Sequence, residues 1–342
     1  MNVLFIGGSN LVIKNGVSTL IPKSLIDAGE KVDEVYNIAV GATSCLFGLE
    51  SLTLFKKKEV DLVFIEYGIN DLPLYANDRS LWEKSFTALL LLVKDKFPNA
   101  HVVTILLGRQ KERFWNNQQR MHQKMTVMSE KAGALVIDVD KELKSKVGST
   151  VDFKDFYLDE SHYASPNVTQ YIASIVVGDY MLNRSLGFFD NARKNSKQDA
   201  LGLYGLPGQI ACYENSRFHK QTTILEKNEA IEIKVKGTPV AISFISANDS
   251  CSLLVEAGNK KKIINTKRKK STLGKFSFIL KQIPLYGMLD KASNDKSIQT
   301  IKLTAIDKLS PLWNDEIVQR TYGMDAAGSQ DKNIYISHLS TF

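Results

Sequence analysis

Residues 3–10 read VLFIGGSN, and this stretch decides the fold of the first half of the chain. Four apolar residues followed at once by two glycines are typical of a buried strand that ends in a tight turn. The turn matches neither Gly-x-Gly-x-x-Gly nor the Gly-Lys-Ser/Thr phosphate loop, so it does not indicate nucleotide binding. Two interpretations of Ser9 remain: it merely starts the next helix, or it is a nucleophile presented at the end of a strand.

The same alternation of a short apolar run and a helical period continues to about residue 185. Strands that alternate with helices form βαβ units, so the pattern predicts an α/β fold with a parallel sheet covered by helices on both faces. The expected strands are Val3–Ile6, Val35–Ala39, Leu62–Glu66, His101–Leu107 and Ala134–Asp138. The helical periods lie near residues 17–28, 43–56, 80–96, 113–132 and 167–184.

The second half of the chain has a different character. Residues 1–190 are predicted to form the α/β domain, residues 191–210 a glycine-containing linker, and residues 211–342 an all-β domain of sandwich or jelly-roll type. The net charge of +7 belongs to the later part, because the 24 basic and 24 acidic residues up to Asp199 cancel. The expected strands are Ala230–Val235, Val240–Ile245, Ser252–Glu256, Lys262–Asn265, Lys275–Leu280, Ile298–Ala305 and Asn333–Ser337.

Three of the α/β strands end in glycine or polar residues. The segments that follow them are Gly7-Gly8-Ser9, Gly41-Ala42-Thr43 and Gly68-Ile69-Asn70-Asp71. In an open parallel sheet, ligands bind in the crevice beyond the carboxyl ends of the strands. A fourth polar segment, Asp159-Glu160-Ser161-His162, precedes the last long helix. We therefore expect these segments to face one crevice.

Ser9, His162 and Asp159 are the residue types that a serine nucleophile requires. The hydroxyl becomes nucleophilic when a base takes its proton, and the base needs a third group to fix its tautomer. The spacing of three lets Asp159 bond Nδ1 of His162 while Nε2 faces Ser9. The oxyanion is expected to meet the backbone N–H groups of Ser9 and Gly41 and the side-chain amide of Asn70.

These four segments, in this order, resemble the four sequence blocks of the SGNH (GDSL-like) hydrolase family. The blocks of that family supply Ser, Gly, Asn and His, with Asp three residues before the His, and they match Ser9, Gly41, Asn70, His162 and Asp159 here. The resemblance covers roughly residues 1–185 and implies a flavodoxin-like parallel sheet and ester chemistry through an acyl-enzyme. The chain departs from the family in the first block, where Gly8 replaces the common Asp and Asn10 the common Leu.

Arg109, Arg113 and Trp115 follow the fourth predicted strand and are candidate substrate-binding residues. Arginine and tryptophan suit anionic or sugar-like substrates. The alternative is a solvated helix face with one packed tryptophan. His122, on the same helix, is expected to have a structural role, and Asp71 is expected to cap a helix or turn.

Two basic runs, Lys260–Lys262 and Lys267–Lys270, stand out in the second half. Charges along the edge of a hairpin discourage strand-to-strand aggregation, which is one interpretation of these runs. The other is a surface that docks on an anionic glycan or an anionic membrane. Nucleic acid is not an expected partner, because no aromatic platform accompanies the lysines.

The activity predicted first is the removal of O-acetyl, or another short O-acyl group, from a carbohydrate. The same residues would serve a polysaccharide O-acetyltransferase that uses acetyl-coenzyme A as donor, and a third hypothesis is a non-catalytic carbohydrate-binding protein. The esterase requires no cofactor, and Cys45, Cys212 and Cys251 suggest neither a disulfide framework nor a zinc site. The first residues lack the features of a signal peptide, and no apolar run reaches the length of a membrane span, which together predict a cytoplasmic protein.

Overall fold

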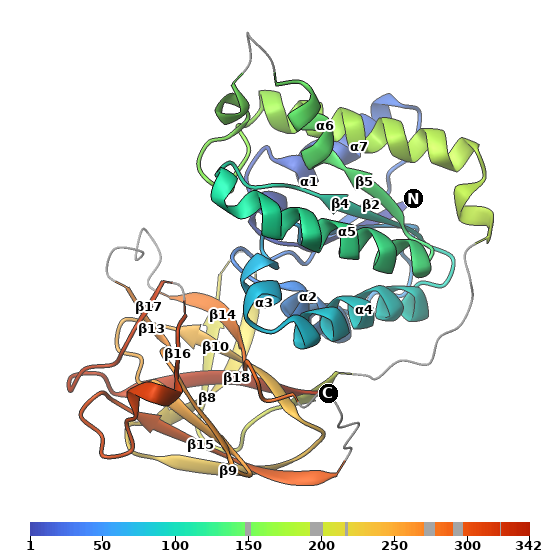
Figure 1. Ribbon diagram of the computed structural model, residues 1–342. Coiled ribbons are helices and arrows are strands. Elements are labelled where there is room, and N and C mark those ends of the chain that lie inside the picture. Colours follow the sequence, from blue (N-terminus) through green and yellow to red (C-terminus); the bar gives the residue numbers. More distant parts are fainter. Residues whose placement is uncertain (148–151, 192–200, 216–217, 270–277, 290–296, 322) are drawn as a thin grey trace. The chain divides into compact units, whose positions relative to one another are not determined.

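The structure, a computed structural model, describes residues 1–147, 152–191, 201–215, 218–269, 278–289, 297–321 and 323–342. The chain divides into two compact units, Met1–Asp199 and Ala200–Phe342 (Figure 1). None of the helices in the described ranges combines the length and the apolarity that crossing a lipid bilayer takes.

The first unit is built on a five-stranded sheet in which every pairing is parallel, as predicted. The strand order β2-β1-β3-β4-β5 is that of a flavodoxin-like sheet, whose topological switch point lies between β1 and β3. Ser9 follows β1 and Asn70 follows β3, so both residues lie at this switch point. The strands are β1 (Asn2–Gly7), β2 (Glu34–Asn37), β3 (Leu62–Glu66), β4 (His101–Leu106) and β5 (Leu135–Asp138).

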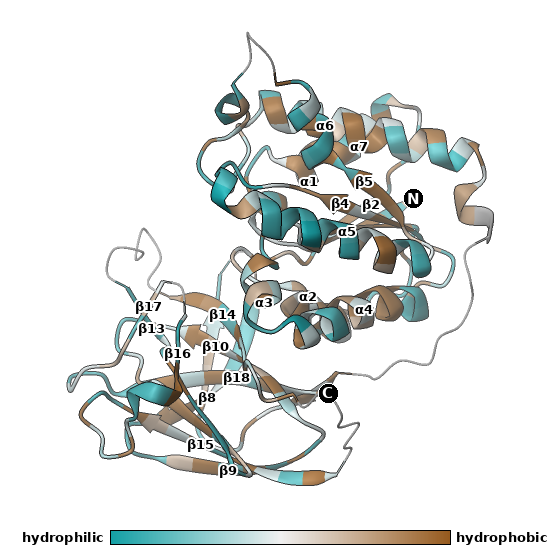
Figure 2. Cartoon of the chain, in the orientation of Figure 1, coloured by the Kyte–Doolittle hydropathy of each residue, from teal (hydrophilic) through white to brown (hydrophobic). Residues whose placement is uncertain are grey.

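Helices cover both faces of this sheet (Figure 1). Helices α1 and α7 pack together on one face with α6 beside them, and α2, α4 and α5 cover the other. Figure 2 shows α5 as largely hydrophilic on its visible side, whereas its Met121 and Met125 are fully buried. The helices are α1 (Val17–Asp27), α2 (Cys45–Leu54), α3 (Leu72–Asn77), α4 (Arg79–Lys96), α5 (Trp115–Lys131), α6 (Val139–Ser145) and α7 (Asn167–Ser185).

Two short helices, α3 and α6, were not predicted from the sequence. Helix α3 carries a proline in its first turn, a position where the missing N–H costs nothing. Helix α6 is capped by Asp138, whose carboxylate accepts a hydrogen bond from the backbone N–H of Lys141 at 2.9 Å. Both helices are too short for a helical period to be read in the sequence.

The second unit is a β-sandwich, in agreement with the predicted all-β domain. One sheet has the order β14-β10-β18-β8-β7, with β6 also paired to β18, and the other has the order β16-β12-β11-β15-β9. Alternate residues of β9, namely Ile231, Ile233 and Val235, point into a core shared by the two sheets. The strands of these sheets are β6 (Gly202–Tyr204), β7 (Ile210–Glu214), β8 (His219–Glu226), β9 (Ala230–Lys236), β10 (Pro239–Ser246), β11 (Ser252–Ala257), β12 (Lys260–Ile264), β14 (Ile279–Pro284), β15 (Ile298–Ile306), β16 (Val318–Gln319) and β18 (Asn333–Thr341).

The expected linker, residues 191–210, is only partly described. Residues 192–200 lie outside the described ranges. Residues 202–204 form strand β6, which pairs with Leu339–Thr341 of β18 and therefore belongs to the sandwich. A three-residue strand among glycines gives no pattern by which it could be predicted. The expected strand Lys275–Leu280 also begins outside the described residues, and β14 is found at Ile279–Pro284.

The first basic run lies on a hairpin. Strands β11 and β12 pair antiparallel and are joined by a turn at Gly258, whose φ of +57° favours glycine. Within this hairpin Lys261 forms an ion pair with Glu256 at 2.6 Å. The Nζ group of Lys260 donates a hydrogen bond to the backbone carbonyl of Met288 at 2.9 Å.

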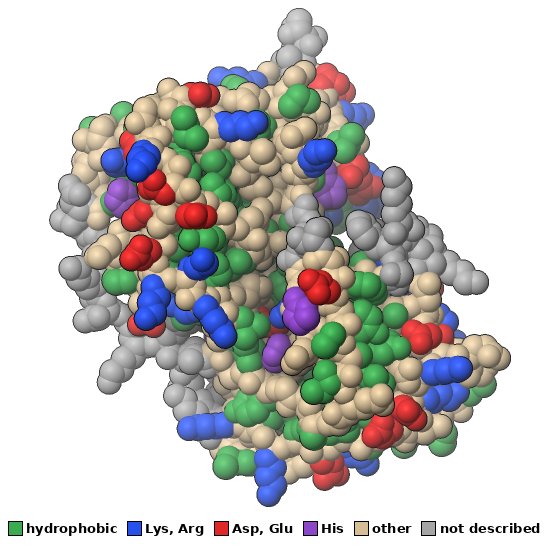
Figure 3. Space-filling view, turned by 180° about the vertical axis from the view of Figure 1, so that it is seen from behind, with side chains coloured by type: hydrophobic (Ala, Val, Ile, Leu, Met, Phe, Trp, Pro, Cys, Tyr) green, Lys and Arg blue, Asp and Glu red, His purple; other side chains and the backbone are tan. Residues whose placement is uncertain are grey.

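The second basic run forms a short ribbon, β13 (Lys267–Arg268) with β17 (Met324–Asp325). Lys267 is bonded to the buried carboxylate of Asp331 at 2.7 Å, and Arg268 is itself buried. Lys270 lies outside the described residues. Figure 3, which shows the molecule from behind, has basic and acidic side chains interspersed on the visible surface. Several of the described lysines thus have local partners, and the docking surface for an anionic glycan or membrane stays a prediction.

Candidate active site

Ser9 is presented by a turn in which the chain passes very close to the neighbouring strand. Strand β1 is buried along Val3–Gly7, and the backbone N–H of Gly8 donates to the carbonyl of Glu66, at the end of β3, at 3.1 Å. A Cβ on Gly7 would lie 2.5 Å from that same carbonyl oxygen. Glycine is needed here because the backbones of β1 and β3 leave no room for a side chain.

The side chains of Asp159, His162 and Ser9 form a continuous chain of hydrogen bonds. Nδ1 of His162 lies 2.7 Å from Oδ2 of Asp159, and Nε2 of His162 lies 2.8 Å from Oγ of Ser9. The other oxygen of Asp159 accepts the backbone N–H groups of Ser161 at 2.8 Å and of His162 at 2.9 Å. The carboxylate therefore fixes both the backbone of the loop and the orientation of the imidazole.

Asp159 is a good partner for a histidine because it stays ionised. Partial burial alone would raise its pKa, but hydrogen bonds from the side chain of His162 and from the backbone of Ser161 hold the pKa below its usual value. A carboxylate accepts a hydrogen bond from the N–H at Nδ1, so Nε2 carries no proton and can accept a hydrogen bond from the hydroxyl of Ser9. The electrostatics of the site thus select the tautomer that a general base requires.

Asn10, which sequence reasoning treated only as a departure from the family, holds the loop of the histidine. Its side chain is buried, and Nδ2 donates to the backbone carbonyl of Ser161 at 3.1 Å. The bond joins the segment after β1 to a loop 151 residues further along the chain. The sequence did contain one indication of this contact. Asn10 is polar at a position where the family commonly has leucine.

The two expected oxyanion donors beyond Ser9 lie against the same turn. A Cβ on Gly8 would lie 2.4 Å from Nδ2 of Asn70, so the amide of Asn70 rests directly on the backbone that precedes Ser9. A Cβ on Gly41 would lie 3.6 Å from Cβ of Ser9, which places the backbone of Gly41 close to Ser9. The next residue, Ala42, has φ +56°, a left-handed conformation that is uncommon for a residue other than glycine.

Replacing Gly8 by alanine should lower kcat by about 10²–10³, the loss expected when one oxyanion donor is removed. The added methyl group must push the amide of Asn70 aside, so the variant should behave like Asn70→Ala. Hydrolysis of p-nitrophenyl acetate by the two single variants and the double variant measures this, and the double variant should be no slower than either single one. Gly178→Ala is the control, because a Cβ at Gly178 meets nothing within 4 Å. A fully active Gly8→Ala enzyme would contradict the geometry.

Two buried acids lie behind this turn. Asp71 accepts hydrogen bonds from the backbone N–H of Cys45 at 2.7 Å and from Nε1 of Trp82 at 2.8 Å. Asp71 therefore caps the first turn of α2, although it lies 26 residues away from Cys45 in sequence. Burial raises the pKa of Asp71 to about 6 and that of Glu66 to about 8, the latter with a contribution from the charge of Asp71. Glu66 is thus protonated at neutral pH and places no negative charge behind the expected oxyanion site.

The raised pKa of Glu66 makes a prediction about stability. Between the ordinary value of 4.5 and about 8, the folded chain holds a proton that the unfolded chain has released. Glu66 therefore lowers the stability as pH rises through this window, by about 1.4 kcal/mol per pH unit at most. Glu66→Gln, which mimics the protonated acid, should show a smaller fall in the free energy of unfolding between pH 5 and 8 than the unchanged protein. Urea titrations at several pH values test this, and identical slopes would refute it.

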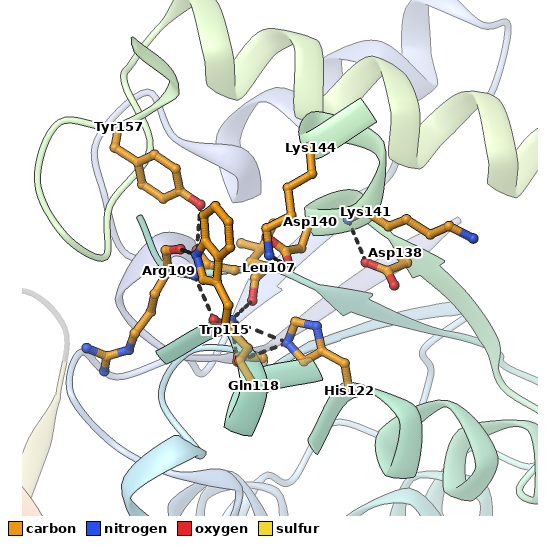
Figure 4. A network of polar contacts seen from close by, with 12 residues as sticks. Leu107, Arg109, Trp115, Gln118, His122, Asp138, Asp140, Lys141, Lys144 and Tyr157 are labelled. Atoms are coloured by element: carbon orange, nitrogen blue, oxygen red, sulfur yellow. Dashed lines mark hydrogen bonds and ion pairs between the residues drawn. The ribbon is translucent and has the colours of Figure 1, made fainter. Parts of the chain in front are cut away.

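Arg109, Arg113 and Trp115 lie on the segment before and at the start of α5, but they differ in what they offer a substrate. Nε1 of Trp115 donates to the carbonyl of Arg109 at 2.9 Å, and its ring packs edge-on against Phe153 and under Nζ of Lys144 (Figure 4). Trp115 is thus a packed residue, which corresponds to the alternative left open for it.

The two arginines lie near the loop of the catalytic candidates. Their guanidinium groups stack on the ring of Phe114, at 4.9 Å for Arg109 and 4.7 Å for Arg113. Arg113 and Lys111 both pair with Glu160, which follows Asp159 directly. Arg113 is two-thirds exposed, so these arginines remain candidates for contact with substrate. Within the described residues, no group of three or more His, Cys, Asp or Glu side chains is arranged to hold a metal ion.

Comparison with known proteins finds solved structures with a similar fold. No protein-family model and no curated protein matches the chain. Among solved structures, the chain is similar to a two-domain esterase active on acetylated mannans, co-crystallised with mannopentaose, with a TM-score of 0.65 and 12% identity. The match covers 100% of this chain and 90% of that one. A second structure of a two-domain esterase active on acetylated mannans gives a TM-score of 0.64 and 12% identity, covering 100% of this chain and 91% of that one. Both units of the chain thus share the fold of the two-domain esterases.

Proposed function

We propose that the chain is a serine esterase that removes acetyl, or another short O-acyl group, from a polysaccharide. The observation that carries this proposal is the chain of hydrogen bonds from Asp159 through His162 to Ser9, with Asn70 and Gly41 at the same turn. A serine with a base, an orienting carboxylate and oxyanion donors is the arrangement that acyl transfer requires.

In the first half of the reaction, Oγ of Ser9 attacks the carbonyl carbon of the ester. Its proton passes to Nε2 of His162, and Asp159 stabilises the imidazolium that forms. The negative charge on the former carbonyl oxygen is met by N–H groups of Ser9, Gly41 and Asn70. When the C–O bond of the ester breaks, His162 returns the proton to the sugar oxygen, and the acyl group remains on Ser9.

In the second half, water replaces the sugar hydroxyl. His162 takes a proton from the water as its oxygen attacks the acyl-enzyme, and the proton returns to Oγ of Ser9 as the carboxylic acid leaves. The side chains of His162 and Asp159 are 30% and 53% exposed, so water has access to the base. This exposure favours hydrolysis over transfer to another acceptor, because transfer requires that water be kept out.

The class of substrate is inferred from the relatives in fold. Two solved structures that match along both units are esterases active on acetylated mannans. The match covers 100% of this chain, so it includes the β-sandwich as well as the α/β unit, and an acetylated polysaccharide is the substrate that we propose for this chain as well. Fold similarity alone does not fix function, so the sugar must be identified by experiment.

The decisive experiment offers acetylated mannan to the protein and measures the acetate released. Supporting results are acetate release together with covalent labelling of the protein by a fluorophosphonate, which requires an activated serine. A parallel reaction supplies acetyl-coenzyme A and deacetylated mannan. Consumption of the thioester only when the glycan is present would establish an O-acetyltransferase instead. Glycan binding with neither turnover nor labelling would establish a non-catalytic binding protein.

A further inference from the structure

Gln118 is a fully buried polar residue on α5. Its side chain contacts His122 on the same helix and bonds two segments that carry the candidate active site. Its Nε2 group donates to the carbonyl of Gly68 at 3.2 Å and to that of Leu107 at 3.1 Å. Its Oε1 atom accepts the backbone N–H of Arg109 at 3.0 Å. One amide thus bonds the turn after β3 and the segment after β4 at the same time (Figure 4).

The two segments that Gln118 joins lead to different parts of the site. Gly68 precedes Asn70 by two residues, on the turn that presents the expected oxyanion donor. Gly108, between Leu107 and Arg109, binds the hydroxyl of Tyr163 through both its N–H at 2.9 Å and its carbonyl at 3.0 Å. Tyr163 follows His162 directly, so this second segment fixes the loop of the base.

Close packing leaves little freedom at this junction. A Cβ on Gly68 would lie 2.6 Å from the carbonyl oxygen of Leu107, and a Cβ on Gly108 would lie 1.8 Å from Oδ1 of Asp140. His122, one turn after Gln118, also lies 3.1 Å from the carbonyl of Gly68 through Nε2. Burial lowers the pKa of His122, so its ring stays neutral and adds no charge to the junction.

The loop of the base is attached to the same glycine a second time. The hydroxyl of Tyr157 donates to the carbonyl of Gly108 at 2.9 Å, and its ring stacks on that of Tyr163 with centroids 4.5 Å apart. Residues 157 and 163 flank the segment that holds Asp159 and His162, and they pair as an isolated bridge. Both ends of the catalytic loop are therefore anchored to the backbone that Gln118 holds.

We propose that Gln118 is a positioning residue, which sets the distance between the oxyanion donor Asn70 and the base His162 without touching the substrate. This inference rests on the proposed function. Oxyanion stabilisation depends on donors placed where charge develops, so a shift of the Gly68–Asn70 turn relative to the base lowers the rate of the chemical step. Substrate binding is left largely unchanged, because Gln118 is buried behind the site.

The test compares Gln118→Met with Ser129→Ala. Methionine keeps the length of the side chain but removes the amide donors and the acceptor. Ser129→Ala is the matched control, because it removes another buried hydrogen bond of α5, from Oγ of Ser129 to Oγ1 of Thr104 on β4 at 2.9 Å, away from the site. On p-nitrophenyl acetate, Gln118→Met should lower kcat by about 10- to 100-fold with KM changed by less than about 3-fold. Ser129→Ala should keep kcat while it shifts the thermal midpoint by a similar amount.

A double-mutant cycle separates positioning from general destabilisation. If Gln118 acts through Asn70, Gln118→Met should cost much less in the Asn70→Ala background than in the unchanged protein. The proposal would be overturned if Gln118→Met lowered kcat by the same factor in both backgrounds. It would also be overturned if the kcat of Gln118→Met equalled that of Ser129→Ala.

A second variant covers the case in which Gln118→Met fails to fold. Tyr163→Phe removes the hydroxyl bonds to Gly108 and should produce the same fall in kcat at constant KM, and a kcat equal to that of Ser129→Ala would then overturn the proposal. Failure of the proposed function itself is recognised separately, by an unchanged activity of Ser9→Ala. If Ser9→Ala is inactive and the kcat of Gln118→Met is unchanged, only the positioning role of Gln118 is refuted.

Discussion

Ser9→Ala should lower kcat by about 10⁶-fold, to the level left by binding and the oxyanion donors alone. Alanine has no oxygen to form the acyl-enzyme, and His162 is left without the proton that it takes in the first step. The fold should survive, because Oγ of Ser9 is bonded within the described structure to the partly exposed His162. The same variant should no longer be labelled by a fluorophosphonate.

The measurement is acetate release from acetylated mannan together with mass spectrometry of the labelled protein. Ser174→Ala, on the exposed side of α7, is the control for loss of a serine hydroxyl, and it should keep both activity and labelling. Retained activity in Ser9→Ala would mean that another group forms the acyl-enzyme or that water attacks directly.

Asp159→Asn should lower kcat by about 10⁴-fold while the loop keeps its shape. The oxygen of asparagine can still accept the backbone N–H groups of Ser161 and His162, as Oδ1 of Asp159 does. Its NH₂ group, however, would face Nδ1 of His162 and donate to it, so the proton of the ring would move to Nε2. A protonated Nε2 cannot accept the proton of Ser9, and the base is lost through its tautomer.

A kinetic comparison with Asp155→Asn separates this effect from a general loss of acidic charge. Asp155 lies four residues before Asp159 and accepts a hydrogen bond from the backbone N–H of Asp152. It takes no part in the hydrogen bonds that connect Asp159 and His162 to Ser9. Asp155→Asn should keep kcat, and Asp159→Asn should unfold at nearly the temperature of the unchanged protein. Equal kcat values in these two variants would rule out the orienting role of Asp159.

The sequence was sufficient for the residues whose position follows from topology. Ser9 and Asn70 each follow a buried strand, and parallel strands bring their carboxyl ends to one edge, so both could be placed before any coordinates were known. The spacing of Asp159 and His162 likewise made their hydrogen bond foreseeable. Their catalytic roles remain predictions, which the variants above test.

Residues defined by contacts that are remote in sequence could not be found in this way. The side chains of Asn10 and Gln118 form hydrogen bonds with backbone groups 151 and 50 residues away. The local sequence pattern does not predict those partners. The sequence likewise could not decide between the two interpretations of Trp115, because it does not show that Phe153 and Lys144 contact its ring. The short helix α6 and strand β6 escaped prediction since their period could not be read over so few residues.

Ser9 and His162 lie 153 positions apart in the sequence, which has a consequence for biosynthesis. As the chain leaves the ribosome, Ser9, the proposed nucleophile, is made before His162, its proposed base, which follows only after the fifth strand of the sheet. A nascent chain shorter than this carries Ser9 without the group that would activate it. Under the proposed mechanism, ester cleavage therefore requires a first unit that is nearly whole, and its onset would report that the unit has folded.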